Sequence, residues 1–331
     1  PNICSRRWIW EQYDHQVMLN TVVLPGGDAA VLRIGDTGRG EITTLGIAVS
    51  SDCNGRYCYL DPYAGAQIAF AEAARNVACS GGRPAAITDC LNFGNPEKPE
   101  VFWTFLESVR GLAAACTAFG VPVISGNVSF YNESFGQPIY PTPTVGLVGI
   151  LDDIEDHCTL GFKSEGDAVV LLGRTKAELG GSEYLKVVHG MVSGRPPKVD
   201  LVDERLLTEL IVSAIRTGIV RSAHDCSEGG LAVALAECCL AGGIGARVDA
   251  GSTLPGAVAL FSESQARAVL TVDAAHFDAL KTLAATHGTA CVHIGTVGGD
   301  RLVIGDHADV SLEEIRAAYE PTLEKLVHGE A

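Results

Sequence analysis

The chain has 331 residues, 47% of them hydrophobic, which suggests two domains of about 150 residues each. Its 24 Lys and Arg face 40 Asp and Glu, and the resulting net charge of −16 opposes binding to nucleic acid or to an anionic membrane surface. The 11 cysteines never occur as C-x-x-C, a usage typical of buried thiols in a reducing cytosol. No apolar run reaches the length of a membrane span, so we expect a cytoplasmic protein. Small phosphorylated ligands stay compatible, because 38 glycines allow backbone N–H groups to approach a phosphate.

The first half of the chain mixes predicted strands and helices. Residues 1–19 begin with proline and a Trp-rich charged stretch, so we interpret them as a linker or N-terminal extension. Apolar runs, periodicity and Gly or Pro punctuation then predict strands at 29–34, 43–50, up to Asp89, 121–125 and 140–151, and helices at 64–82 and about 100–119.

The acidic stretch 152–167 is the best linker candidate, because a new apolar strand follows it. Beyond it we expect helices near 182–189, 200–217, 229–241, 274–287 and 311–327, and strands near 168–173, 219–224, 245–249, 266–272, 292–297 and 301–304. The mixture predicts an α/β or α+β protein, with domains over 20–152 and 153–331.

The stretch "AITDCLNFGNPEKPE" (86–100) contains the first candidate site. We expect its strand to end at Asp89, and the strand at 121–125 to be followed by Gly126, Asn127 and Ser129 in "SGNVSFYNES". Two strands that end in oxygen-bearing side chains at one sheet edge are typical of ligand sites in α/β folds. Two unrelated turns would also explain this pattern, since Asp, Asn, Gly and Pro are ordinary turn residues.

A second candidate site joins Glu72 and Asn76, which are four residues apart and therefore project from one helix face. Their oxygens suit Mg²⁺, and Asp28 after a Gly-Gly turn offers a further carboxylate. A solvated helix face and a turn aspartate are the simpler alternatives.

The third candidate is "SAHDCSEGG" (222–230), where His224, Asp225, Ser227 and Glu228 precede a predicted helix. Helix N-termini attract anions, and such side chains can cap the helix or hold a metal. A cap needs only one of them. The fourth candidate, "FSESQARAVL" (261–270), is explained nearly as well by a turn at a strand edge as by ligand binding.

Taken in order, these motifs closely resemble the C-terminal half of the formylglycinamidine ribonucleotide synthase family, which is similar to aminoimidazole ribonucleotide synthetase. The resemblance covers essentially the whole chain. It is carried by "DPYAG", "AEAARN", "TDCLNFGNPEKPE", "GNVSFYNES", "YPTPTVG", "GGSEY", "HDCSEGGLAVALAECC" and "ESQ".

The resemblance implies a barrel-forming N-terminal domain followed by a C-terminal α/β domain, and an ATP-dependent ligase. In that family ATP phosphorylates the amide oxygen of formylglycinamide ribonucleotide, and ammonia from a partner glutaminase displaces the phosphate. By this resemblance Asp89 and Gly126 contact ATP, Asn127 binds Mg²⁺ and Ser129 contacts the substrate. The positions that hold Mg²⁺ and a second, auxiliary nucleotide in long-chain members correspond to Asp28, Glu72, Asn76, Asp225 and Ser227.

None of the nine histidines lies in the "THNHP"-like motif that carries the family's general base in the first tandem half. The resemblance therefore implies that this half needs the other tandem half, besides a glutaminase and a small bridging subunit. Two hypotheses stay open: a half that completes an active site, or a non-catalytic nucleotide-binding half that docks the glutaminase. A kinase or synthetase closer to aminoimidazole ribonucleotide synthetase is a weaker third possibility.

Overall fold

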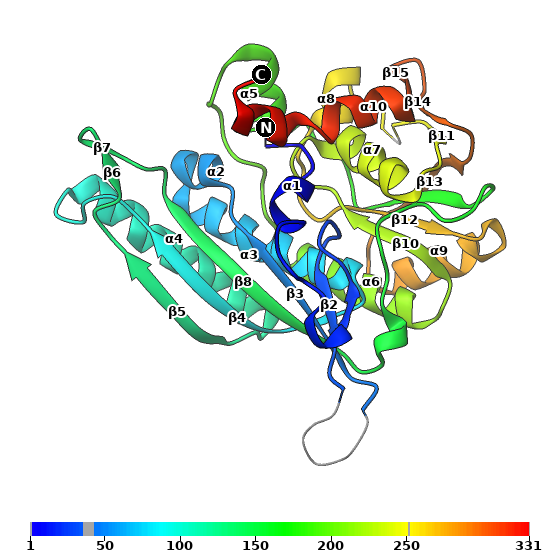
Figure 1. Ribbon diagram of the computed structural model, residues 1–331, viewed down its shortest axis with the longest axis horizontal. Coiled ribbons are helices and arrows are strands. Elements are labelled where there is room, and N and C mark those ends of the chain that lie inside the picture. Colours follow the sequence, from blue (N-terminus) through cyan, green and yellow to red (C-terminus); the bar gives the residue numbers. More distant parts are fainter. Residues whose placement is uncertain (1, 36–42, 251, 331) are drawn as a thin grey trace.

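The computed structural model describes residues 2–35, 43–250 and 252–330, which are organised around two β-sheets (Figure 1). The first sheet has the strand order β1-β2-β3-β8-β4-β5, so β5 forms one edge. Its strands are β1 (Thr21–Val23), β2 (Ala30–Arg33), β3 (Gly46–Asp52), β8 (Thr142–Leu151), β4 (Arg83–Asn92) and β5 (Val123–Ser129). A short hairpin of β6 (Glu133–Ser134) and β7 (Gln137–Pro138) follows β5.

Two long helices, α3 (Pro62–Cys79) and α4 (Pro99–Phe119), cover one face of this sheet. Asp61 caps α3 by accepting a hydrogen bond from the N–H of Ala64 at 3.0 Å, and Pro62 occupies the first turn. Gly120 ends α4 in the left-handed conformation. The small side chains of α3 let it pack closely on the sheet, where strand residues alternate between buried and half-buried along β8. The short helix α2 (Gly55–Leu60) precedes α3.

The second sheet has the order β10-β12-β9-β13-β11-β14-β15. Its strands are β9 (Ala168–Leu172), β10 (Val220–Asp225), β11 (Ala246–Val248), β12 (Ala268–Val272), β13 (Cys291–Val297), β14 (Arg301–Ile304) and β15 (Ala308–Ser311). The remaining helices are α5 (Glu183–His189), α6 (Leu201–Arg216), α7 (Gly230–Gly242), α8 (Gly256–Phe261), α9 (Phe277–Thr286), α10 (Leu312–Tyr319) and α11 (Thr322–His328). Both β9 and β12 are buried along their whole length, because hydrophobic clusters lie on both faces of the sheet.

The mixed α/β class is confirmed, and most predicted elements occur near their expected residues. The predicted ends of two strands were wrong. β4 continues three residues beyond Asp89 to Asn92, and β5 contains Gly126, Asn127 and Ser129 instead of ending before them. The helix expected at 311–327 is interrupted at Pro321, which cannot donate the hydrogen bond that a helix interior requires. The sequence patterns gave no expectation of β1, α2, the β6–β7 hairpin, α8 or β15.

The connection over 152–167 is packed and not an exposed tether. It includes η2 (Ile154–Asp156), and Ile154, Cys158 and Phe162 are buried in three different hydrophobic clusters.

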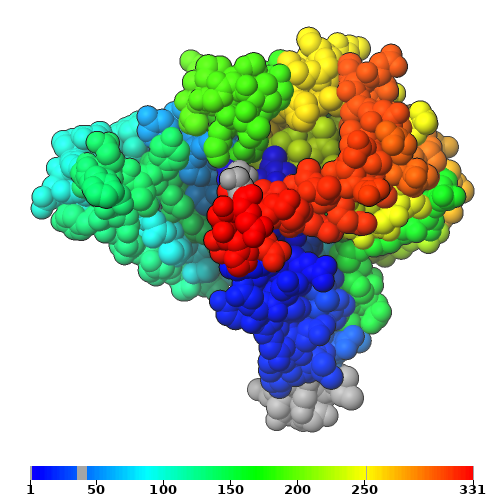
Figure 2. All heavy atoms as spheres, turned by 45° about the horizontal axis from the view of Figure 1, so that its top comes forward, coloured from blue at the N-terminus to red at the C-terminus, as the bar shows by residue number. Residues whose placement is uncertain are grey.

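The N-terminal segment, with α1 (Arg7–Trp10) and η1 (Val17–Leu19), lies beside the C-terminal helices in Figure 2. The N–H of Ser5 donates to the carbonyl of Tyr319 at 3.0 Å, which ties the two ends of the described chain together. Within the described ranges, no helix combines the length and the apolar character that crossing a bilayer requires.

Candidate active site

The first candidate site lies on β4 and β5, which are adjacent parallel strands. Their register places Asp89 beside Gly126, Cys90 beside Asn127 and Asn92 beside Ser129. The two motifs therefore meet in space, which excludes the alternative of two unrelated turns.

Strand alternation divides these residues between the two faces of the sheet. Asp89 shares its face with Ile87 and Leu91, which belong to the core under α3 and α4. Asn127 and Ser129 project from the opposite face, where Asn127 is exposed and Ser129 half-buried. The two residues that the resemblance assigns to ATP thus share one face, and those assigned to metal and substrate share the other. Because β5 is the edge strand, a ligand that contacts both sets must pass over this edge.

Gly126 is required at its position by the side chain beside it. A Cβ atom on residue 126 would lie 2.3 Å from Oδ1 of Asp89, so any other residue would displace this carboxylate. Partial burial raises the pKa of the Asp89 carboxyl above its ordinary value. The glycine therefore allows the Asp89 carboxylate to lie across β5.

The "NFGNPEK" segment after β4 is an irregular turn held by Glu133 of β6. Oε1 of Glu133 accepts from the backbone N–H of Asn95 at 3.1 Å and from Nζ of Lys98 at 2.8 Å. The Lys98 and Asn95 contacts lower the pKa of Glu133, so this carboxylate is ionised at neutral pH. These contacts hold the turn in a defined position at the end of β4.

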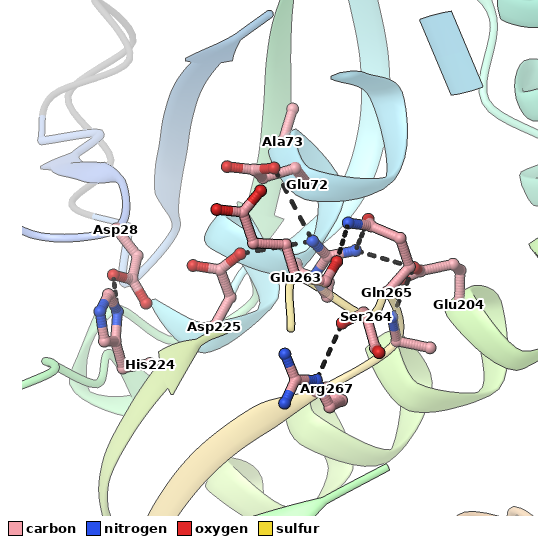
Figure 3. A network of polar contacts seen from close by, with 12 residues as sticks. Asp28, Glu72, Ala73, Glu204, His224, Asp225, Glu263, Ser264, Gln265 and Arg267 are labelled. Atoms are coloured by element: carbon pink, nitrogen blue, oxygen red, sulfur yellow. Dashed lines mark hydrogen bonds and ion pairs between the residues drawn. The ribbon is translucent and has the colours of Figure 1, made fainter. Parts of the chain in front are cut away.

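The second and third candidate sites coincide in one buried acidic junction, which comprises Asp28, Asp52, Glu72, Asp225 and Glu228 (Figure 3 shows three of them). Burial raises the pKa of Asp225 to about 6 and that of Glu228 to about 7. Burial, reinforced by the neighbouring carboxylates, holds the pKa of Glu72 well above its usual range. The solvated helix face considered for Glu72 is therefore wrong, since Glu72 is 8% exposed.

Arg75 provides the positive charge of this junction and is itself fully buried. Its guanidinium lies 2.8 Å from Glu204, 3.5 Å from Asp225 and 4.0 Å from Glu72. It also donates to Oε1 of Gln265 at 3.2 Å. Burial opposes its charge, but the surrounding carboxylates outweigh burial and raise the pKa of Arg75. Arg75 thus supplies one positive charge to a cluster of several carboxylates.

A second ionic chain joins the two halves of the fold. His224 of β10 contacts Asp28 through Nδ1 at 2.5 Å and Glu237 of α7 through Nε2 at 3.2 Å. Tyr319 donates to the other oxygen of Glu237 at 3.1 Å. Burial disfavours the imidazolium, but these two carboxylates outweigh it and raise the pKa of His224.

Oxygen ligands for a divalent cation are present here, because Oδ2 of Asp28 and Oδ2 of Asp225 are buried without a hydrogen-bond partner. The one group of three or more metal-ligating side chains found in the described residues is Asp28, His224 and Asp225. Asn76 is half-buried one helical turn beyond Glu72, and Ser227 is half-buried in the loop before α7.

The fourth candidate, "FSESQ", is an internal turn. Oε1 of Glu263 accepts from the N–H groups of Gly229 at 2.7 Å and Glu183 at 2.9 Å, and its Oε2 accepts from the hydroxyl of Tyr57. Glu263 therefore holds the starts of α5 and α7 together. Arg267, also fully buried, donates to the carbonyls of Ser262 and Ser264 within the same turn. In the part of the chain that the structure describes, these polar groups are engaged internally, which favours the strand-edge turn.

The sequence patterns did not predict the roles of Arg75 and Glu204, whose contact joins segments far apart in the chain. The motif "GNVSFYNES" contains Asn132 and Glu133, for which no role was predicted. The only sequence signal for these two was their polar character directly after a strand.

Comparison with known proteins agrees with this architecture. The family model for AIR synthase related protein, N-terminal domain, matches residues 26–151, and that for its C-terminal domain matches 164–307. Phosphoribosylformylglycinamidine synthase subunit PurL of Alkaliphilus metalliredigens is 52% identical over 314 residues, covering 95% of this chain and 42% of that protein. The PurL subunit of Moorella thermoacetica is 50% identical over 331 residues, covering 99% of this chain and 44% of that protein.

A solved structure of PurL from T. maritima complexed with FGAR has a TM-score of 0.72 at 20% identity, covering 83% of this chain and 46% of that one. This likeness concerns the fold. The chain spans less than half the length of the two curated relatives named above. With both domain models matched in sequence order over most of its length, the chain belongs to the AIR synthase related family.

Proposed function

We propose that this chain is half of an ATP-dependent ligase that converts formylglycinamide ribonucleotide to formylglycinamidine ribonucleotide in purine biosynthesis. The observation that carries the proposal is the pairing of β4 with β5, which aligns Asp89 with Gly126 and brings Asn127 and Ser129 onto one face. The identity of about 50% to PurL subunits supports the same assignment.

In the proposed reaction the substrate amide oxygen attacks the γ-phosphorus of ATP, and ADP leaves. Ammonia then attacks the activated carbon, inorganic phosphate leaves, and a C–N bond replaces the C–O bond. Asp89 and Gly126 position ATP, and the Ser129 hydroxyl binds the ribonucleotide. Asn127 would hold a Mg²⁺ ion, which neutralises phosphate charge when bound.

We propose that the chain acts in the cytosol with the other tandem half, a glutaminase subunit and a small bridging subunit. We also propose an extension over 1–19, a barrel-forming domain over 20–152 and an α/β domain over 153–331. The ranges of the two family models support this division. The 11 free cysteines support a reducing compartment.

The buried acidic junction is not included in the proposed catalytic site. We propose that Asp28, Glu72, Asn76, Asp225 and Ser227 mainly support the fold, because the buried guanidinium of Arg75 lies within 4.0 Å of Glu72, Glu204 and Asp225. By the resemblance, they are also the positions at which any auxiliary nucleotide and its Mg²⁺ would bind. The second candidate function, a non-catalytic half that docks the glutaminase, is favoured only by the missing "THNHP"-like motif.

The test is to mix this chain with a partner half that carries that motif and to measure ADP and formylglycinamidine ribonucleotide with ammonia as nitrogen donor. We expect turnover that depends on both halves and falls at least tenfold in Asp89→Ala, on the scale of a lost charged contact. Full turnover with Asp89→Ala would favour the non-catalytic alternative.

A further inference from the structure

Asn132 lies three residues beyond the end of β5, and its side chain turns back toward Ser129. Its two Nδ2 hydrogens are shared among three acceptors, the Ser129 carbonyl at 2.9 Å, the Phe93 carbonyl at 3.1 Å and the Ser129 hydroxyl at 3.2 Å. The Ser129 hydroxyl lies 3.4 Å from Oδ1 of the same amide. One side chain therefore contacts both the backbone and the hydroxyl of the proposed substrate-binding serine.

The backbone around Asn132 fixes this amide in place. The N–H of Phe93 donates to the Ser129 carbonyl at 3.0 Å, that of Asn132 to the Phe93 carbonyl at 3.1 Å, and that of Tyr131 to the Gly94 carbonyl at 3.0 Å. Tyr131 adopts a φ of 60°, in the left-handed region that few side chains favour. The turn after β5 thus folds back on the segment after β4 and directs Asn132 to the junction between them.

Among the described residues, Asn132 is the one side chain that hydrogen-bonds to Ser129. Asn92, which pairs with Ser129 across the strands, donates instead to the carbonyl of Cys90 at 2.9 Å. A serine hydroxyl can occupy three staggered positions, and a fixed donor on its oxygen favours one of them.

We propose that Asn132 is a positioning residue that holds the Ser129 hydroxyl in the orientation in which it binds the ribonucleotide. The inference rests on the proposed function, because Ser129 must contact substrate for its orientation to matter. Without the Nδ2 donor the hydroxyl is less restricted, and ordering it costs free energy when the ribonucleotide binds.

The test uses the two-half assembly with ammonia, comparing Asn132→Ala, Asn132→Asp, Ser129→Ala and the Ser129→Ala/Asn132→Ala double variant. Asn132→Asp retains the side-chain volume but removes both N–H donors. We expect each single variant to raise KM for the ribonucleotide about tenfold, the effect of losing one hydrogen bond, with kcat within about twofold. The double variant should show the KM of Ser129→Ala alone, since Asn132 acts through that hydroxyl.

A further rise of KM in the double variant, equal to that of Asn132→Ala alone, would overturn the inference. So would an unchanged KM in Ser129→Ala, or unfolding of both Asn132 variants, which would make the residue purely structural. Absence of turnover in the unsubstituted assembly would instead reject the proposed function, and this inference with it.

Discussion

The β4–β5 site and the buried acidic junction contain similar polar side chains, which differ in exposure and in their partners within the protein. At β4–β5 the polar side chains lie at or near the exposed edge of the sheet, and among the described residues the side chain of Asn127 makes no hydrogen bond. At the junction the carboxylates of Glu72, Glu204 and Asp225 surround a buried guanidinium. An exposed polar side chain on an edge strand is available to a ligand, whereas carboxylates that face a buried guanidinium are held within the fold. Residue type alone does not distinguish the two.

The largest effect is expected from removing the cation of the junction. Arg75→Met should lower the free energy of unfolding by about 3–5 kcal/mol, because Glu204 and Asp225 would keep buried charge without a partner. Urea denaturation at neutral pH measures this. Arg205→Met is the control, since the ion pair of Arg205 with Glu209 is exposed and should change stability by less than about 1 kcal/mol. Equal losses in both variants would show that the junction does not depend on Arg75.

At β4–β5 the expected effect is on turnover. Asn127→Ala should lower kcat of the two-half assembly about 10²-fold, the scale of a lost electrostatic contact in the transition state. Its melting temperature should stay within about 2 °C, because the side chain is exposed on an edge strand. Gln137→Ala, an exposed amide in the neighbouring hairpin, is the matched control for kcat and melting temperature. Near-normal turnover of Asn127→Ala at limiting Mg²⁺ would contradict the assignment of Asn127 to the metal.

The junction should also make stability depend on pH. The folded-state pKa of Glu228, about 7, lies above its unfolded value, so the folded protein binds more protons and stability falls as pH rises from about 5 to 8. Glu228→Gln should make this fall shallower, by about 1 kcal/mol at pH 8 after allowance for the partial exposure of the side chain. Denaturation curves at pH 5, 6, 7 and 8 measure the slopes. A steeper fall of stability with pH in the variant would show that the pKa of Glu228 is not raised by folding.

The smallest expected effect is on self-association through the exposed edge of β5. β5 exposes Val123, Ile124 and Val128 along an unpaired strand edge, so the isolated chain should self-associate at micromolar concentration. Ile124→Lys should weaken the association several-fold, because a charged residue on an edge opposes further pairing. Sedimentation velocity separates the species. A stable monomer before substitution would count against an exposed pairing edge.

The sequence predicted the class, most elements and the meeting of the two motifs because apolar periodicity and strand-end polarity are local signals. It placed the ends of β4 and β5 too early, since Asp, Asn and Gly are depleted in strands and pairing with neighbouring strands makes them extended here. The role of Arg75 was not predictable. Its partner Glu204 lies 129 residues away, and a Glu and an Arg three apart on a helix resemble a solvated pair.

The distinction between the two regions is tested most directly by calorimetric titration of Mg-ATP into the two-half assembly with Asp89→Asn or Glu72→Gln. The raised pKa of Glu72 means that Gln mimics its protonated form, so this variant should fold normally. We predict that Asp89→Asn weakens binding at least tenfold, whereas Glu72→Gln leaves affinity and stoichiometry unchanged. Loss of a bound nucleotide in Glu72→Gln, with Asp89→Asn unaffected, would contradict the account and place the nucleotide at the junction.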